Sequence, residues 1–261
     1  MAELTISMQE WRRYSEILKA LSDTAAAEFR DALFKANGYF KGMGLKAPRD
    51  AIIELAYGLV TKYGEGAASA ACLAYDAIAE LSGVSVPAAI PAQTATIGEV
   101  AKAVNGTIKT GNDEIVSGAI GRLVKLAGQD TTLQNAKRDG AQFAWVVRGD
   151  TCAFCITLAS RGWQYASAQA LKDGHAEHVH ANCDCAYAVR FNENTKVEGY
   201  DPDKYLAQYR SAEGNTPDQK INAMRRRYYE ENKERINAQK RDAYQRRKEL
   251  NSSAAEETNV N

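Results

Sequence analysis

Four cysteines and one histidine lie within a short stretch of the chain at the spacing of metal ligands. The stretch contains Cys152-Ala-Phe-Cys155 and then His180-Ala-Asn-Cys183-Asp-Cys185, whereas the fifth cysteine, Cys72, lies far away. Thiolate sulfur and imidazole nitrogen are ligands that a tetrahedral Zn²⁺ prefers, and a site closed by four protein ligands stabilises a fold rather than performing chemistry. The spacing therefore predicts one structural zinc ion, bound by Cys152, Cys155, His180 and Cys183.

The ligand set leaves alternatives open. Cys183 and Cys185 would point to opposite sides of an extended segment, so one of them is expected to bind the ion, and Cys185 is the alternate. His178 is the alternate to His180, and His175 is expected to be a loop residue. Disulfides and unbound thiols are the other interpretations of the cysteines. Disulfides need an oxidising compartment, and the first residues of the chain do not resemble a secretory signal peptide.

The composition is that of an ordinary globular protein. The 261 residues are 45% hydrophobic and 25% charged, and the formal net charge is zero. No apolar run is long enough to cross a bilayer, so no membrane partner is expected. The chain as a whole carries no charge excess that would attract nucleic acid.

The first part of the chain predicts a bundle of helices. Ser7 and Glu10 form a capping box, and apolar residues then recur every three or four positions up to Leu33. Asn37-Gly38 is expected to end this helix, and Pro48 to begin the next. Glycines, prolines and breaks in the apolar pattern divide the rest of this helical part. Interruptions are expected at Gly64 and Gly66, a linker over 83–95, and shorter helices near 96–105, 112–127 and 130–140.

The period of the apolar residues changes around the cysteines. Alternation over 143–147 predicts a strand that enters the cysteine region, and alternation over 186–191 predicts a strand that leaves it. The two strands and the ligand turns between them predict a small β-hairpin-like module. A module of this size has little core, so a metal would supply the missing stability.

The last predicted helix begins at Thr216-Pro217 and runs to about Leu250. Ten Lys or Arg residues against five Asp or Glu residues over 221–250 give it a net charge of +5. It is interpreted either as a solvated helix or as an arm that contacts nucleic acid or an acidic partner. The candidate contact residues are Arg225, Arg226, Arg227, Lys233 and Arg235.

The predicted fold class is therefore mainly α with a small β module. The expected domains are a helical domain at 1–139, a metal-stapled α+β module at 140–192, a helical C-terminal arm at 193–250 and a disordered tail at 251–261.

The cysteine region resembles a known family. Trp145-Val-Val, Asp150-Thr-Cys152-Ala-Phe-Cys155, Leu158-Ala-Ser-Arg-Gly162 and His180-Ala-Asn-Cys183-Asp-Cys185 are similar to motifs of the MuF-like minor head proteins of tailed bacteriophages, especially those of actinobacteriophages. The resemblance covers about 140–192. It extends to the metal ligands, although this chain has Ala153 where several relatives have Pro and lacks a Pro after His180.

The resemblance implies a minor capsid or head morphogenesis protein that is not an enzyme. Such a protein is made in the cytoplasm of the bacterial host and belongs to the virion, at the portal vertex and the head interior. The implied partners are the portal protein and other capsid or scaffold proteins, and packaged double-stranded DNA is a further candidate.

Rival functions depend on the same residues. His175-Ala-Glu177 with a C-x-x-C is similar to the nucleobase deaminase signature, but the order is reversed and no Pro precedes Cys152. A cysteine hydrolase could use Cys155 with a histidine, unless zinc occupies the thiolate. A zinc protein that binds DNA without sequence preference is the third class. Gly106-x4-Gly111 is followed by Asn112 rather than Lys, which argues against a phosphate-binding loop.

Overall fold

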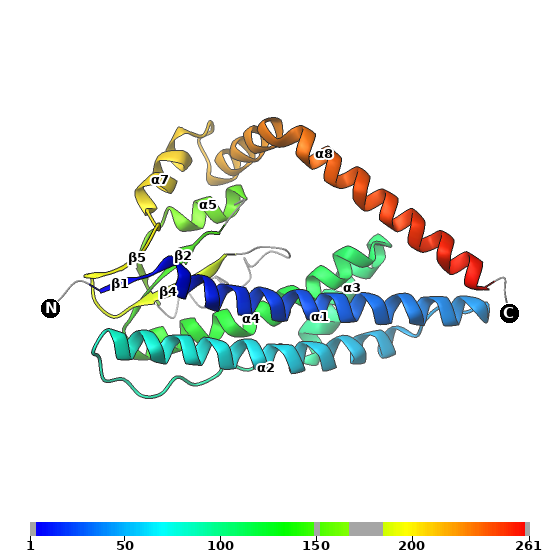
Figure 1. The fold of residues 1–261 in the computed structure, drawn as a ribbon, viewed down its shortest axis with the longest axis horizontal. Coiled ribbons are helices and arrows are strands. Elements are labelled where there is room, and N and C mark those ends of the chain that lie inside the picture. The colour runs from blue at the N-terminus through cyan, green and yellow to red at the C-terminus, as the bar shows by residue number, and fades with distance from the viewer. Residues whose placement is uncertain (1–3, 149–151, 167–184, 259–261) are drawn as a thin grey trace.

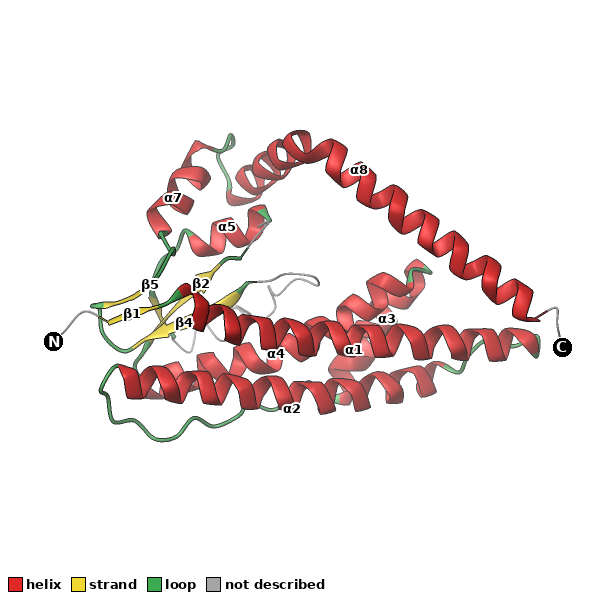
Figure 2. Cartoon of the chain, in the orientation of Figure 1, coloured by secondary structure: helices red, strands yellow, loops and turns green. Residues whose placement is uncertain are grey.

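A computed structural model of the chain describes residues 4–148, 152–166 and 185–258 (Figure 1). Helices predominate, as the sequence predicts. Four of them form an elongated body, in which α4 packs against each of the other three (Figure 2). These helices are α1 (Met8–Gly42), α2 (Arg49–Leu81), α3 (Ile97–Thr107) and α4 (Asp113–Asp139), and a short 3-10 helix, η1 (Ile108–Thr110), follows α3.

The start of α1 agrees with the sequence, but its end does not. Ser7 and Glu10 form the predicted capping box. The helix continues through Gly38 to Gly42, and Gly44 rather than Gly38 adopts the left-handed conformation, with a φ of 72°. The N–H of Leu45 then bonds the carbonyl of Phe40 at 2.8 Å, which is the pattern of a Schellman motif. A glycine inside a helix costs only about 1 kcal/mol, so Gly38 alone does not end it.

The expected interruptions in α2 and α4 are wrong, because the glycines there permit close packing. A Cβ atom on Gly64 would lie 2.8 Å from Cγ2 of Thr94. In α4 a Cβ on Gly121 would lie 2.8 Å from the backbone oxygen of Ser22 in α1, and one on Gly128 would lie 2.6 Å from Cδ2 of Leu18. Each helix therefore runs unbroken past its glycines.

The linker between α2 and α3 contains no helix or strand, as predicted, and side chains of α2 and α4 bind its backbone. Asp76 accepts a hydrogen bond from the N–H of Ala89 at 2.8 Å. Asn135 accepts from the N–H of Ile90 at 2.9 Å and donates to its carbonyl at 2.8 Å. Arg138 donates to the carbonyls of Pro87 and Ala88 at 2.7 and 3.0 Å. These bonds satisfy backbone groups that no strand partner reaches.

Two small sheets lie at one end of the body. Strands β2 (Gln142–Val146) and β4 (Ala186–Arg190) are the two predicted strands, and they pair antiparallel with Trp145 opposite Tyr187. The edge strand β3 (Gln164–Tyr165) adds to β2. The sequence did not indicate the second sheet, in which β1 (Leu4–Ile6) pairs parallel with β5 (Thr195–Val197). Phe143 and Val189 of the first sheet share a hydrophobic cluster with Tyr75 and Leu133 of the helices.

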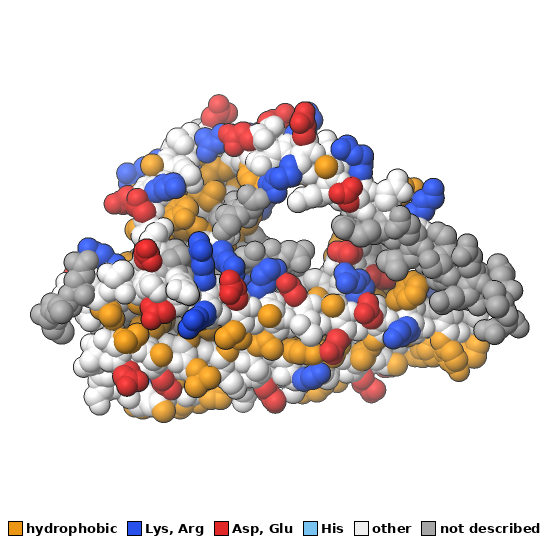
Figure 3. Space-filling view, in the orientation of Figure 1, with side chains coloured by type: hydrophobic (Ala, Val, Ile, Leu, Met, Phe, Trp, Pro, Cys, Tyr) orange, Lys and Arg blue, Asp and Glu red, His pale blue; other side chains and the backbone are white. Residues whose placement is uncertain are grey.

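Three further helices lie in the described part of the chain after α4. They are α5 (Ala153–Ala159), α7 (Pro202–Ser211) and α8 (Pro217–Thr258). The helix α8 begins as predicted and continues past residue 250 to Thr258, through Ala and Glu residues that favour helix. Figure 3 shows open space between part of α8 and the helical body. Among the helices described, none combines the length and the apolar composition that a membrane span requires.

Candidate functional site

Cys152 is the residue that begins α5. Its backbone is extended, and its Sγ atom accepts a hydrogen bond from the N–H of Cys155 at 3.4 Å. A side chain in this position satisfies one of the N–H groups that the first turn of a helix leaves unpaired. The C-x-x-C pattern thus lies on the first turn of a helix, with Cys152 exposed and Cys155 buried.

Cys155 and Cys185 lie in one buried cluster with aromatic side chains. Cys155 is fully buried and Cys185 is 2% exposed. The ring of Tyr187 makes edge contacts with those of Phe143 and Trp145, at centroid distances of 5.2 and 4.8 Å. Burial raises the pKa of Tyr187 above its usual value. The backbone of α5 and the start of β4 therefore bring two of the candidate ligands into the same apolar region.

The remaining candidate ligands, His180, Cys183 and His178, lie outside the described residues, as does His175. Within 4–148, 152–166 and 185–258, no three His, Cys, Asp or Glu residues gather in a group that could hold a metal ion. Of the candidate ligands, Cys152, Cys155 and Cys185 lie in the described part of the chain, and the zinc ligand set stays a prediction.

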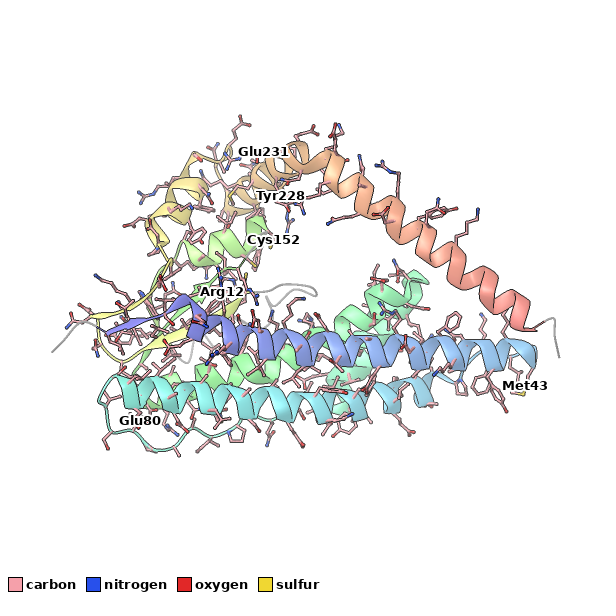
Figure 4. The ribbon with its side chains drawn as sticks, viewed as in Figure 1. Arg12, Met43, Glu80, Cys152, Tyr228 and Glu231 are labelled. Atoms are coloured by element: carbon pink, nitrogen blue, oxygen red, sulfur yellow. The ribbon has the colours of Figure 1, made fainter. Side chains whose placement is uncertain are left out.

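The outer face of α5 packs against the C-terminal helices. Ala153 belongs to a cluster with Ala212, Ile221 and Met224, and partly buried side chains such as Phe154 and Tyr209 extend it. Figure 4 shows Cys152 at the end of α5 that lies beneath the first turns of α8. The C-x-x-C helix is therefore the layer between the β2–β4 sheet and α8.

The Leu158–Gly162 motif forms the end of α5. Leu158 and Ala159 are buried, and Gly162 adopts a φ of 66° that favours glycine. Its N–H bonds the carbonyl of Ala159 at 3.3 Å, and the hydroxyl of Tyr200 donates to the same carbonyl at 3.0 Å. The motif residues thus turn the chain and hold α5 against the segment that leads to α7.

Sequence reasoning missed Arg190, at the end of β4. Its guanidinium lies 4.7 Å from the centre of the Trp163 ring, and its Nε donates to Gln142 at 2.7 Å. Burial lowers the pKa of Arg190 below its usual value. The one available signal was its place at the end of an alternating strand.

The candidate contact residues of α8 do not share one face. Arg225, Arg226 and Arg227 are exposed but point in successive directions around the helix. Arg235 donates to the hydroxyl of Tyr228 at 2.8 Å and to Asn232 at 3.0 Å. Lys233 instead lies beside the ring of Tyr229, with 5.9 Å between its Nζ and the ring centre.

The model of the VG15 protein family matches residues 5–212. This match covers the helical body, both sheets, α5 and α7, so the chain belongs to the VG15 protein family. That membership makes it a phage-encoded protein. The matched segment ends before α8 begins at Pro217. Comparisons with curated proteins and with solved structures give no match.

Proposed function

We propose that this protein is a minor capsid, or head morphogenesis, component of a tailed phage that links other proteins of the head. Membership of a phage family supports the proposal, together with the likeness of the cysteine region to MuF-like proteins. The structural observation that carries it is the position of α5. The described residues of the shared motif lie between the helical body and the projecting helix α8, and they pack against both.

Zinc fits this role as a structural ion. Cys152 and Cys155, with His180 and Cys183, would bind it, and Cys185 and His178 are the alternate ligands. A bound ion would fix the start of α5 to the residues that precede β4 in the sequence, and would thereby help to fix the direction of α8. Cys155 lies fully buried among aromatic side chains, which suits a ligand or core residue better than an exposed nucleophile.

The tip of the α1–α2 hairpin supplies a surface for a protein partner. Four large apolar side chains there are between 46% and 66% exposed, namely Phe34, Tyr39, Met43 and Leu45. Over 32–49 the chain carries only basic charges, on Lys35, Lys41, Lys46 and Arg49. Exposed apolar side chains that cluster mark interaction sites. The tip, on which Figure 4 labels Met43, fits an apolar pocket with an acidic rim on a portal or scaffold protein.

Coexpression with the portal, scaffold and major capsid proteins of the same phage tests the proposal. We expect the chain to co-sediment with assembled heads, and Tyr39→Ser with Leu45→Ser to abolish this association. The matched control is Leu73→Ser, which removes an apolar side chain that is 74% exposed on the side of α2. Heads that form normally and exclude the wild-type chain would contradict the proposal, and equal loss in control and tip variants would contradict the role of the tip.

A further inference from the structure

The helix α8 carries basic side chains on one face of its exposed part. Its contacts with α5 and α7 involve its first turns, where Ile221 and Met224 are buried. From Tyr229 to Arg241 no residue is buried. Figure 3 shows basic side chains along this exposed part of the helix.

Tyr229 lies at the centre of that face. The Nζ atoms of Lys233 and Lys240 each lie 5.9 Å from the centre of its ring. Successive side chains of an α-helix are rotated by about 100° around the helix axis. Measured around that axis, Arg225 and Tyr244 therefore lie within about 60° of Tyr229. Tyr229 is 37% exposed and Tyr244 is 67% exposed. We define Arg225, Tyr229, Lys233, Lys240 and Tyr244 as the basic–aromatic face.

The acidic residues of the same segment point elsewhere. Glu230, Glu231, Glu234 and Asp242 are turned by about 100° or more from Tyr229. Of these, Glu230 reaches the face, through an exposed ion pair of 3.6 Å with Lys233. Exposed ion pairs contribute about 0–1 kcal/mol, so a phosphate can replace this carboxylate at little cost.

We propose that the basic–aromatic face binds the phosphate backbone of double-stranded DNA without sequence preference. Three cations and two tyrosine hydroxyls lie along one side of a helix over about 28 Å, at about 1.5 Å per residue. Lys, Arg and Tyr side chains are common donors to phosphate oxygens. A straight row of cations suits the evenly spaced phosphate charges of a duplex. An acidic protein partner would instead be expected to bind a surface whose shape complements its own.

The proposed function supplies the source of the duplex, which is DNA inside the phage head. The binding itself does not require that function, because α8 lies beyond the segment that matches the VG15 family. An unlinked duplex in solution therefore tests the inference independently of head assembly.

The experiment measures binding of the full chain to fluorescent 30-base-pair duplexes of two unrelated sequences between 50 and 200 mM salt. Lys233→Ala with Lys240→Ala removes two charges from the face. The matched control, Arg227→Ala with Arg241→Ala, removes two charges from the side that carries Glu234. We expect similar affinity for both sequences and a roughly 10- to 100-fold loss for the face variant near 0.1 M salt, since each phosphate contact contributes a slope of about 0.9 to log affinity against log salt.

The control should lose much less affinity and keep most of the salt slope. Equal losses in the two variants would show that only net charge matters and would overturn the proposal, as would no binding at 50 mM salt. Competition by polyglutamate as strong as that by duplex would assign the face to acidic proteins and also overturn it. Circular dichroism must show equal helix content in all variants. A variant that still enters heads but has lost duplex binding would support the inference, while exclusion of the wild-type chain from heads would count against the proposed function alone.

Discussion

The backbone N–H of Cys155 donates a hydrogen bond of 3.4 Å to the Sγ atom of Cys152. This bond makes Cys152 the cap of α5 whether or not its sulfur also binds a metal. A capping role and a metal role predict different tolerances to substitution, because serine caps a helix well but is a poor zinc ligand.

The pair Cys152→Ser and Cys152→Ala separates the two roles. If Cys152 binds zinc, we expect both variants to lose about one zinc per chain and to exchange amide hydrogens faster over β2, α5 and β4, while α1 to α4 stay protected. If it only caps α5, the serine variant should resemble wild type and the alanine variant should lose about 1 kcal/mol. Elemental analysis of protein purified without added metal, with hydrogen exchange, checks this. Wild-type protein with no zinc and freely titrating thiols would contradict the metal site.

Gly121 and Gly58 give opposite predictions for one substitution. A Cβ on Gly121 would lie 2.8 Å from the backbone oxygen of Ser22, so Gly121→Ala must push α1 and α4 apart. We expect it to destabilise the protein by about 1–3 kcal/mol. Gly58, in the middle of α2, has nothing within 4 Å of its Cβ position. Gly58→Ala should therefore stabilise the protein by about 1 kcal/mol. Urea unfolding of both variants measures these changes. A Gly121→Ala variant that is more stable than wild type would disprove the close approach of α1 and α4 at this position.

These glycines also show where sequence patterns mislead. Local patterns identified helices of the body, the strands β2 and β4 and the start of α8, because each depends on nearby residues. They placed breaks at Gly64 and near Gly128, since a glycine that ends a helix and one that admits a neighbouring backbone look alike in one sequence. The β1–β5 pairing was missed because it joins two three-residue segments far apart in the chain.

In the candidate site, too, local features could be predicted from the sequence and tertiary contacts could not. The C-x-x-C turn was predictable, because two cysteines three apart form a local feature. The contact of α5 with Ile221 and Met224 was not, because it depends on the tertiary path of the chain. The basic–aromatic face was readable in principle from the spacing of Tyr229, Lys233 and Lys240. The consecutive arginines Arg225, Arg226 and Arg227 are the more conspicuous pattern in the sequence, but neighbouring residues of a helix point in different directions.

Arg138 is expected to hold the α2–α3 linker in place. Its guanidinium makes two bonds of 2.7 Å to Asp139 and also bonds the carbonyls of Pro87 and Ala88. Tyr75 donates to the same carboxylate at 2.8 Å. Arg138→Met keeps the aliphatic stem, and we expect a loss of about 2 kcal/mol, since charged hydrogen bonds contribute about 1.5–3 kcal/mol.

The readout for Arg138→Met is local. Hydrogen exchange should rise at the N–H of Ala89 and Ile90, whose bonds to Asp76 and Asn135 need the linker in register. The matched variant is Tyr75→Phe, which removes one donor to Asp139 and should leave the linker protected. Unchanged protection of the linker in Arg138→Met would show that the other side chains suffice to hold it.

Asp130 is predicted to make stability fall as pH rises. Burial raises the pKa of this carboxyl from 3.8 to about 6, and the charge of Glu99 adds to the effect. Below pH 4 the group is protonated in both the folded and the unfolded chain, so it costs nothing. Between about pH 4 and 6 the folded chain keeps a proton that the unfolded chain releases, so the free energy of unfolding falls through that window. The full cost, present above pH 6, is about 3 kcal/mol at most, at about 1.4 kcal/mol per pKa unit.

Asp130→Asn tests this directly, because the amide cannot ionise. We expect the variant to be more stable than wild type by about 1–3 kcal/mol at pH 7.5 and to differ little from it at pH 4. Asp113→Asn, in the first turn of α4, is the matched control for replacing a carboxylate in the same helix. The measurement is urea unfolding at pH 4, 5, 6 and 7.5. A wild-type stability that rises relative to Asp130→Asn between pH 4 and 6 would mean that the native fold favours the ionised carboxylate, and the predicted sign would then be wrong.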